Sequence, residues 1–345
     1  MNQELKQSLC LKVPLSKVKE AQSSLKDIVC KDLKFRKNRN CVYIPITRIP
    51  SKPIEYEIDK KEFERKRKKQ TTYKELIKVP EELKSLLPRS FDQVGDIAII
   101  KIPDLLRPYR KEIGEAMIRV YKSVNVVCRD EGVKSGYRLR DIEVIAGDHR
   151  THTIHREYGV ETALDLKKVF FSPRLAREHY LVSKKVKKGS LVVDMFAGCG
   201  PFSLMIAKYA KPKRIYAIDL NPEAIKWLKL NAEKNRVGEI IEPICKDAHE
   251  VIKELAQNNV VANNIIMNLP FVSSEYFEDA LKISGGGTRI HYYEIIDRDK
   301  VEGRKDWLRQ IAHKKGKDLE VSEVRRIKTY SAKQINIALD LKIKE

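Results

Sequence analysis

The sequence has no run of 18 apolar residues, so it offers no candidate for a membrane-spanning helix. Its first residues, Met1 to Gln7, are polar and lack the apolar core of a signal peptide. The 6 cysteines include no C-x-x-C pair, which argues against both a zinc knuckle and a disulfide framework. These absences predict a protein of a reducing, cytoplasmic compartment with no membrane contact.

Acidic residues are too few to balance the basic ones. The 345 residues include 69 Lys and Arg against 48 Asp and Glu, which leaves a formal net charge of +21. A thermophile-like surface would explain many charges of both signs but not this imbalance. The composition therefore favours a polyanionic partner, with nucleic acid ahead of an acidic membrane.

The residue pattern changes three times along the chain, which suggests several domains. Residues 1–58 combine short strands with one helix and predict a small α/β module. Residues 59–79 are rich in Lys and Arg and predict a basic linker, although an exposed charged helix fits them equally well. Residues 80–172 predict an α+β middle domain. Residues 173–345 alternate strands and helices, which predicts a doubly wound, Rossmann-like α/β domain with a late antiparallel strand.

A glycine-containing turn is the strongest local signal. A hydrophobic strand ends in Asp194 and turns through Gly198 and Gly200 into a helix. Glycines let the backbone approach a ligand at the carboxyl end of a strand, where doubly wound sheets bind cofactors. The next strand ends in Asp219, which is well placed to accept hydrogen bonds from two ribose hydroxyls. A dinucleotide site is disfavoured, because Ser203 replaces the third glycine of that fingerprint and Asp194 would repel a pyrophosphate.

This turn is similar to the S-adenosylmethionine site of class I methyltransferases. That cofactor carries a ribose and a cationic sulfonium but no phosphate, so carboxylates suit it. Asp247 follows the next strand, where such folds bring a side chain to the adenine amino group, although a helix cap is the plainer interpretation. Tight glycine packing without a ligand is the structural alternative for the whole turn.

A second motif, Asn268-Leu269-Pro270-Phe271, ends a later strand. Methyltransferases that act on planar nitrogens of bases often carry Asn/Asp-Pro-Pro-Tyr/Phe at this place. The side-chain amide and the stiff backbone hold the edge of the base, and the aromatic ring can stack on it. Here Leu269 replaces the first proline, and an ordinary strand-ending turn is the alternative.

Over roughly residues 8–343 the chain resembles the archaeal and eukaryotic family of tRNA (guanine-37-N1)-methyltransferases, which also contains the bifunctional wyosine-pathway enzymes. Besides the two motifs above, the segments that carry the resemblance are Phe91–Asp96, Tyr137–Arg140, Arg150–His155, Val169–Leu175 and His291–Tyr293. The resemblance implies a monomeric enzyme that uses S-adenosylmethionine to methylate N1 of guanosine 37 in tRNA. It also implies that the N-terminal module docks on the outer corner of the tRNA, while the other two domains enclose the anticodon-loop base.

Other activities remain open beside this one. Phe170 stands where many members of the family have Tyr. A phenylalanine at this position resembles the subgroup that also methylates C7 of 4-demethylwyosine. An aminocarboxypropyl transferase of the same pathway would use the same cofactor, but Leu269 argues against it. A non-catalytic tRNA-binding protein is a third interpretation, which the intact acids and glycines of the cofactor turn disfavour.

The resemblance also implies roles for individual residues. Glu178 matches the proposed general base, Arg138 the arginine that contacts guanine O6, and Asn268 with Pro270 the wall that holds the guanine edge. An exposed helix acid is the alternative for Glu178, and a phosphate-binding arginine the alternative for Arg138. The residues expected to contact the substrate base are Phe170, Arg174 and Phe271. The residues expected to bind the cofactor are Asp194, Phe196, Gly198, Gly200, Asp219, Asp247 and Asn268.

Two further features bear on these roles. His179 stands where an arginine often follows the general base. His149, His152 and His155 are three residues apart, a spacing that points side chains to opposite faces of a strand, so no metal site is predicted.

Overall fold

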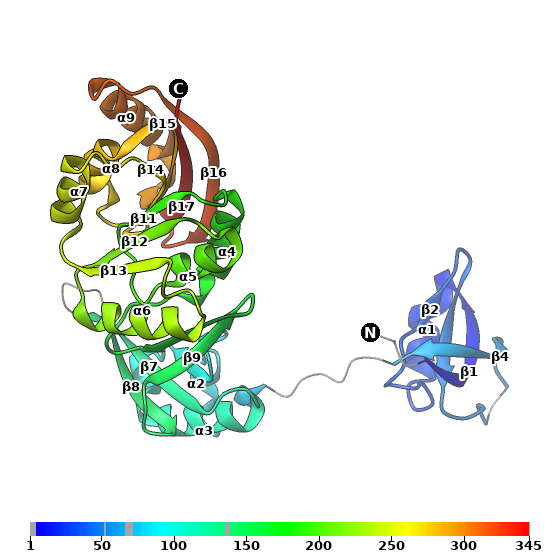
Figure 1. Ribbon diagram of the computed structural model, residues 1–345. Helices are drawn as coiled ribbons and strands as arrows, with labels where there is room; N and C mark the ends of the chain where they lie inside the picture. Colours follow the sequence, from blue (N-terminus) through cyan, green and yellow to red (C-terminus); the bar gives the residue numbers. More distant parts are fainter. Residues whose placement is uncertain (1–4, 52, 66–71, 135–138, 345) are drawn as a thin grey trace. The chain divides into compact units, whose positions relative to one another are not determined.

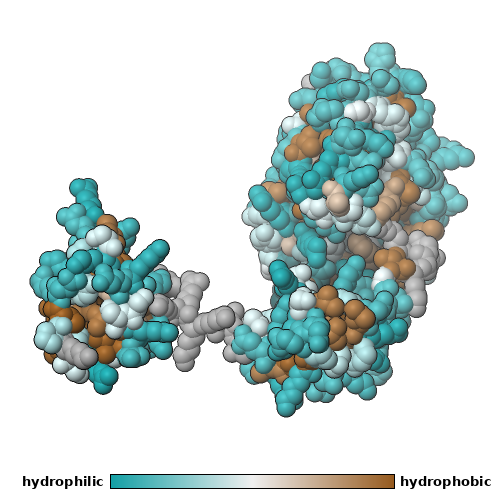
Figure 2. All heavy atoms as spheres, turned by 180° about the vertical axis from the view of Figure 1, so that it is seen from behind, coloured by the Kyte–Doolittle hydropathy of each residue, from teal (hydrophilic) through white to brown (hydrophobic). Residues whose placement is uncertain are grey.

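The computed structural model describes residues 5–51, 53–65, 72–134 and 139–344. The chain divides into two compact units, Met1–Thr72 and Tyr73–Glu345, and each has hydrophobic cores of its own (Figure 1). No helix among the described residues is long and apolar enough to cross a membrane. Hydrophilic side chains cover most of the face shown in Figure 2, and the apolar ones gather in separate patches.

The first unit is a four-stranded antiparallel sheet with one short helix against it. Its strand order is β2-β3-β1-β4. The elements are β1 (Leu5–Pro14), α1 (Val18–Ser24), β2 (Arg36–Lys37), β3 (Cys41–Ile46) and β4 (Glu57–Glu64). Leu11, Ile44 and Ala21 pack together between sheet and helix, so this unit is an α/β module, as the sequence predicts.

The prediction of a linker over residues 59–79 is wrong at both ends. Its first residues belong to β4, which pairs antiparallel with β1 and places Lys60 opposite Leu9. Three of the exposed positions of this strand are Glu57, Lys60 and Glu62 and the fourth is Ile58, while Phe63 is buried. At the other end, Tyr73 and Ile77 pack into a core of the second unit. The prediction followed the many charged residues of this segment and missed the few apolar residues that pack into the two units at its ends.

The second unit begins with a four-stranded sheet of order β5-β6-β7-β8, which α3 covers on one side. Its elements are α2 (Glu81–Lys84), β5 (Asp92–Val94), β6 (Ile97–Ile100), α3 (Arg110–Val120), β7 (Val126–Lys134) and β8 (Leu139–Gly147). A hairpin of β9 (His152–Glu157) and β10 (Val160–Asp165) follows. Asn231 in the next domain ties to this hairpin, because its amide exchanges hydrogen bonds with both backbone groups of Ala163, at 2.7 and 2.9 Å.

A seven-stranded sheet forms the rest of the second unit, in the order β13-β12-β11-β14-β15-β17-β16. Its strands are β11 (Leu191–Asp194), β12 (Arg214–Asp219), β13 (Ile241–Cys245), β14 (Ala262–Met267), β15 (Ser284–Asp297), β16 (Leu319–Thr329) and β17 (Gln334–Ile343). The first five strands in this order are parallel, and β17 runs antiparallel between β15 and β16. This confirms the predicted Rossmann-like sheet with a late antiparallel strand.

Helices cover both faces of this sheet. On one face, α4, α5 and α6 share a hydrophobic core with the strands, and on the other face α7, α8 and α9 share a second core (Figure 1). Their bounds are α4 (Ala176–Lys185), α5 (Pro201–Ala210), α6 (Pro222–Lys234), α7 (Ala248–Gln257), α8 (Phe277–Lys282) and α9 (Val301–Lys314). Because β11, β12 and β14 are parallel, the residues that follow them meet at one edge of the sheet.

The turn from β11 into α5 requires its glycines. Gly198 and Gly200 have φ of +56° and +96°, a region that side-chain-bearing residues rarely adopt. A Cβ atom on Gly200 would also lie 2.3 Å from Leu228 in α6. The tight turn therefore brings α5 against α6 and leaves the backbone open at the edge of the sheet.

Candidate functional site

A cavity of about 400 Å³ lies at this edge of the sheet, and it joins the two sequence motifs. A volume of this size is typical of pockets for small ligands. The predicted residues that line it are Phe170, Phe196, Gly198, Asp219, Asp247, Asn268, Pro270 and Phe271. The structure thus brings together most of the residues that the sequence analysis assigned to cofactor and base.

Asp219 is held in one orientation by the cofactor turn. Its Oδ2 accepts a hydrogen bond from the backbone N–H of Gly198 at 2.7 Å, and its Oδ1 accepts one from Asn221 at 2.9 Å. Burial raises the pKa of Asp219 above its usual range. Each carboxylate oxygen can accept more than one hydrogen bond, so the fixed carboxylate still has acceptor capacity for the hydroxyls of a ribose.

Asp194 and Gly200 do not line the cavity. Asp194 is fully buried, and its Oδ2 accepts a hydrogen bond from the Ser203 hydroxyl at 2.7 Å. Burial raises the pKa of Asp194 to about 7. Ser203, which distinguishes this turn from a dinucleotide fingerprint, therefore tethers the strand-ending acid to helix α5.

Asp247 was considered both as a cofactor contact and as a helix cap, and the structure places it at a helix cap and in the cavity lining. Its side chain caps α7 by accepting a hydrogen bond from the backbone N–H of His249 at 2.7 Å. It also lines the cavity beside Ala248 and near Phe196. The ring of Phe196 packs edge-on against Tyr276, with centroids 4.9 Å apart. These apolar walls and the Asp219 carboxylate fit the adenine and ribose of S-adenosylmethionine.

The turn after β14 forms the opposite wall. The N–H of Ile295 donates to the carbonyl of Pro270 at 2.7 Å, and the Ser273 hydroxyl donates to the carbonyl of Leu269 at 3.0 Å. Phe271 is partly exposed and packs edge-on against Tyr330. The side-chain amide of Asn268, which lines the cavity, has no hydrogen-bond partner among the residues that the structure describes. The backbone of this wall is thus fixed, while the amide of Asn268 is available to a ligand.

Glu178 is buried and does not line the cavity. Its carboxylate accepts hydrogen bonds from Arg325 in β16, at 3.0 Å from Nη2 and 3.2 Å from Nε, and from the Tyr293 hydroxyl at 3.2 Å. Arg325 also binds Asp340 at 2.6 Å. Burial alone would raise the pKa of Asp340, but hydrogen bonds from His291 and Arg325 hold it well below its usual range.

This buried ion cluster was not foreseen from the sequence. Arg325 and Glu178 are 147 positions apart, and no local pattern marks either as the partner of the other. The alternative of an exposed helix acid is wrong for Glu178, because only 6% of it is exposed.

The structure describes only one of the two arginines that the sequence analysis assigned to the site. Arg174 is half-exposed and lies outside the cavity lining, where it pairs with Asp92 at 2.8 Å. Arg138 falls outside the described residues. The nearby Arg140 pairs with Asp92 and Asp130, each at 3.5 Å. The aromatic Phe170, by contrast, lines the cavity and is partly exposed.

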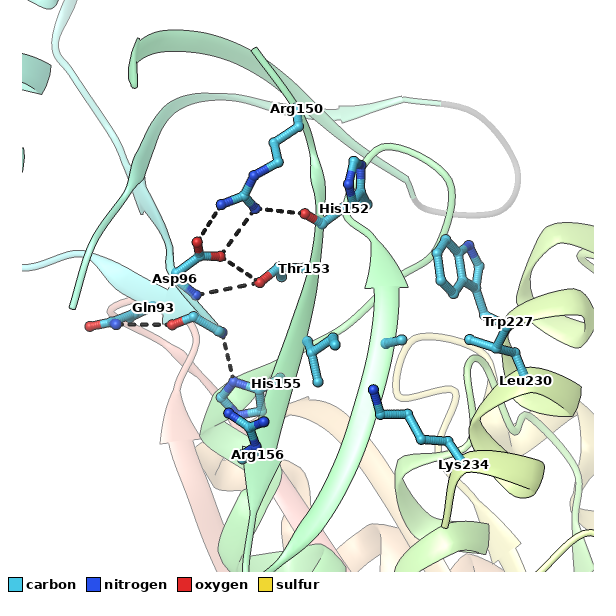
Figure 3. A pocket seen from close by; sticks show the side chains of 13 residues that line it. Gln93, Asp96, Arg150, His152, Thr153, His155, Arg156, Trp227, Leu230 and Lys234 are labelled. Atoms are coloured by element: carbon cyan, nitrogen blue, oxygen red, sulfur yellow. Dashed lines mark hydrogen bonds and ion pairs between the residues drawn. The ribbon is translucent and has the colours of Figure 1, made fainter. Parts of the chain in front are cut away.

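A larger groove of about 980 Å³ lies between β9 and α6 (Figure 3). Several of its polar groups are paired with one another. Arg150 binds Asp96, and the Thr153 hydroxyl donates to the same carboxylate at 2.7 Å. Trp227 and Lys234 from α6 form the opposite side. The groove contains none of the predicted site residues, so the smaller cavity is the candidate active site.

The Rossmann-like sheet with its inserted β17, the glycine turn and the acid that ends β12 define an S-adenosylmethionine-dependent methyltransferase. The family model of the TRM5/TYW2 methyltransferase domain matches residues 153–321, and that of the TYW2 N-terminal domain matches residues 73–151. The chain belongs to this TRM5/TYW2 family of methyltransferases.

Its relatives include enzymes of two specificities. The chain is 38% identical to the tRNA (guanine(37)-N(1))-methyltransferase Trm5b of Pyrococcus abyssi over 97% of this chain and 99% of that protein. It is 36% identical to the tRNA 4-demethylwyosine(37)-methyltransferase Taw21 of Saccharolobus solfataricus, over 64% of this chain and 86% of that one.

Solved structures agree with this assignment over the full length. The crystal structure of Pyrococcus abyssi Trm5b matches with a TM-score of 0.76, covering 98% of this chain and 100% of that one. The structure of a complex of aTrm5 and tRNALeu matches with a TM-score of 0.71 at 36% identity, covering 97% and 100%.

Proposed function

We propose that this chain transfers a methyl group from S-adenosylmethionine to N1 of guanosine 37 in tRNA. The observation that carries the proposal is that one cavity is lined both by Asp219 and by the turn Asn268–Phe271. A full-length relative at 38% identity that is named for this activity supports it. The cofactor supplies a methyl group on a cationic sulfur, so the protein has to bind it, orient the base and accept a proton.

The cavity residues divide between these tasks. Asp219 accepts hydrogen bonds from the ribose, and Phe196 with Asp247 receives the adenine. Asn268 and Pro270 hold the edge of the guanine, and Phe170 and Phe271 offer aromatic faces to the base. Asp194 and Gly200 act indirectly by shaping the turn.

The proton on guanine N1 requires an acceptor, and negative charge grows on O6 as that proton leaves. The resemblance gives these roles to Glu178 and Arg138, and both stay predictions. In this structure the Glu178 carboxylate binds Arg325 and Tyr293 and does not line the cavity, so this role requires the guanine or the carboxylate to move until the two meet.

Methylation of C7 of 4-demethylwyosine at the same position is the second candidate. Phe170 in place of Tyr and the 36% identity to Taw21 favour it as an additional activity. Aminocarboxypropyl transfer is less favoured, because Leu269 departs from the Asn/Asp-Pro-Pro-Tyr pattern of that group.

The activity can be tested directly. The protein is incubated with labelled S-adenosylmethionine and either unmodified tRNA or tRNA that carries 4-demethylwyosine, and the nucleosides are identified by mass spectrometry. We expect 1-methylguanosine from the first tRNA, and none from a control tRNA with adenosine at position 37. A methylated nucleoside at another position, or none at all, would contradict the proposal.

The first unit is proposed to dock on the outer corner of the tRNA. Because Tyr73–Glu345 has hydrophobic cores of its own, deletion of residues 1–72 should leave the cofactor site folded. We expect the shortened protein to bind tRNA more weakly and with a shallower dependence on salt, since fewer phosphate counterions are released. Filter binding between about 50 and 200 mM salt measures both quantities. Cofactor affinity by calorimetry is the control, and an unchanged salt slope would exclude the docking role.

A further inference from the structure

Three tyrosines and a lysine form a surface cluster that the proposed function does not use. The ring of Tyr158, at the tip of the β9–β10 hairpin, stacks on that of Tyr180 in α4, with centroids 4.5 Å apart and planes at 13°. Tyr180 in turn packs edge-on against Tyr209 in α5, with centroids 5.5 Å apart. The Nζ atom of Lys184 lies 5.0 Å from the centroid of Tyr180 and 4.9 Å from that of Tyr209. We call these four residues the tyrosine–lysine cluster.

The hairpin tip that carries Tyr158 is fixed against α5 (Figure 1). Tyr158 and Gly159 form a two-residue turn. The carbonyl of Tyr158 accepts a hydrogen bond from the Tyr209 hydroxyl, and that of Gly159 accepts one from Lys208. Tyr158 has a φ of +46°, a conformation that is strained for a bulky residue, and yet 48% of it is exposed. An aromatic ring that is held at the surface against backbone strain points to a binding role and not to packing.

The surface around the cluster is basic. Lys184 and Lys188 are exposed and form no ion pair with any residue that the structure describes. The only acid of α4, Glu178, is buried. The backbone N–H of Gly189 donates to the carbonyl of Lys211 at 3.1 Å, which brings the loop after α4 beside the end of α5. Cations without acidic partners favour an anionic ligand. Further exposed lysines of this loop and of the chain after α5 are Lys187, Lys211 and Lys213.

Helix α4 connects this surface to the cavity. Leu175, which directly precedes the helix, lines the cavity. Arg177, Tyr180 and Lys184 follow at spacings of three and four residues, so they share one face of the helix. The helix has 10 residues, so its axis is about 15 Å long at about 1.5 Å per residue. Stacked nucleotides rise about 3.4 Å each, so a strand that leaves a base in the cavity covers this length in about five nucleotides.

We propose that the tyrosine–lysine cluster, together with Lys188, binds the anticodon arm of the substrate tRNA. This inference rests on the proposed methylation of guanosine 37. The lysines bind phosphates of the RNA backbone, and the ring of Tyr158 stacks on a base through the face that Tyr180 does not cover. Aromatic faces beside cations hold nucleic-acid strands in this way without reading their sequence. The cluster therefore contributes affinity for the RNA and takes no part in the methyl transfer.

The test is the salt dependence of tRNA binding by the full-length protein, measured between about 50 and 200 mM salt. The double variant Lys184→Gln with Lys188→Gln should bind tRNA more weakly than the wild type. Each lost phosphate contact reduces the slope of log affinity against log salt by about 1, so this variant should reduce it by about 2. The matched control is Lys253→Gln with Lys314→Gln, which removes two exposed lysines from α7 and α9 on the opposite face of the sheet. Its slope should be that of the wild type.

Tyr158 is tested separately, because stacking releases no counterions. Tyr158→Asn removes the ring, and asparagine is favoured in two-residue hairpin turns with positive φ, so the hairpin should stay folded. We expect tRNA binding to weaken by about 5- to 100-fold, the usual effect of losing one stacked base, with an unchanged salt slope. Tyr158→Phe keeps the ring and should bind as the wild type does. Wild-type affinity of Tyr158→Asn would contradict the stacking role.

Two RNA fragments identify the part of the tRNA that is bound. An anticodon-arm hairpin should bind the lysine double variant more weakly than the wild type, whereas a fragment of the acceptor and T arms should bind both proteins alike. A wild-type salt slope in the double variant, or equal weakening with the acceptor fragment, would overturn the inference while wild-type formation of 1-methylguanosine left the proposed function intact. Absence of 1-methylguanosine with the wild-type protein would overturn the proposed function and the inference together.

Discussion

Replacing Asn268 by alanine should slow single-turnover methylation of guanosine 37 by about 10²–10³-fold, which is the usual effect of losing one positioned hydrogen-bonding group at a reaction centre. Asn268 has no side-chain partner among the residues described, so its amide is available to hold the guanine edge while charge moves on the base. The backbone of the wall should survive the change, because its hydrogen bonds run through Pro270 and Leu269.

The measurement is a quenched time course at saturating S-adenosylmethionine with enzyme in excess over tRNA, so that neither binding nor product release limits the rate. Asn258→Ala is the matched control, since Asn258 is an exposed residue after α7 and does not line the cavity. A wild-type rate for Asn268→Ala, with chemistry limiting, would remove Asn268 from the proposed site.

Asp219→Ala should weaken binding of S-adenosylmethionine by at least about tenfold. Charge-assisted hydrogen bonds contribute about 1.5–3 kcal/mol each, and about 1.4 kcal/mol corresponds to a tenfold change in affinity. The same carboxylate accepts the N–H groups of Gly198 and Asn221, so alanine also loosens the turn. Asp219→Asn keeps an accepting oxygen, and its affinity should lie between those of the wild type and Asp219→Ala.

Isothermal calorimetry of each folded variant measures this affinity. Asp306→Ala, at an exposed acid of α9 that pairs with Arg309, is the control for a lost surface carboxylate. Because burial raises the pKa of Asp219, wild-type affinity should weaken on acidification at a higher pH than for an ordinary aspartate. Equal affinity of wild type and Asp219→Ala would mean that Asp219 does not contact the ribose.

The part of the fold that the sequence predicts best lies around the cofactor turn. Helix α5 follows the glycine turn and strand β12 ends in Asp219, as the sequence predicts, because proline and glycine mark the turn and each strand ends in an acid. The boundary between the two units was predicted less well. The prediction for residues 59–79 followed their local charge. In the structure, pairing with β1 and burial of Phe63 instead place Glu57–Glu64 in the sheet of the first unit.

The sequence by itself determined the class of the protein, and it predicted the residues of the cofactor half of the proposed site. Gly198, Gly200 and Asp219 are specified by short-range conformational and chemical requirements, which a single segment can reveal. Tertiary structure decided which groups surround Glu178, the predicted proton acceptor. Glu178 and His179 are neighbours on one helix, yet the first turns to Arg325 in β16 and the second to Glu157 in β9. Which of two adjacent side chains lines the cavity depends on the strands packed on either side of α4, and no local pattern contains that information.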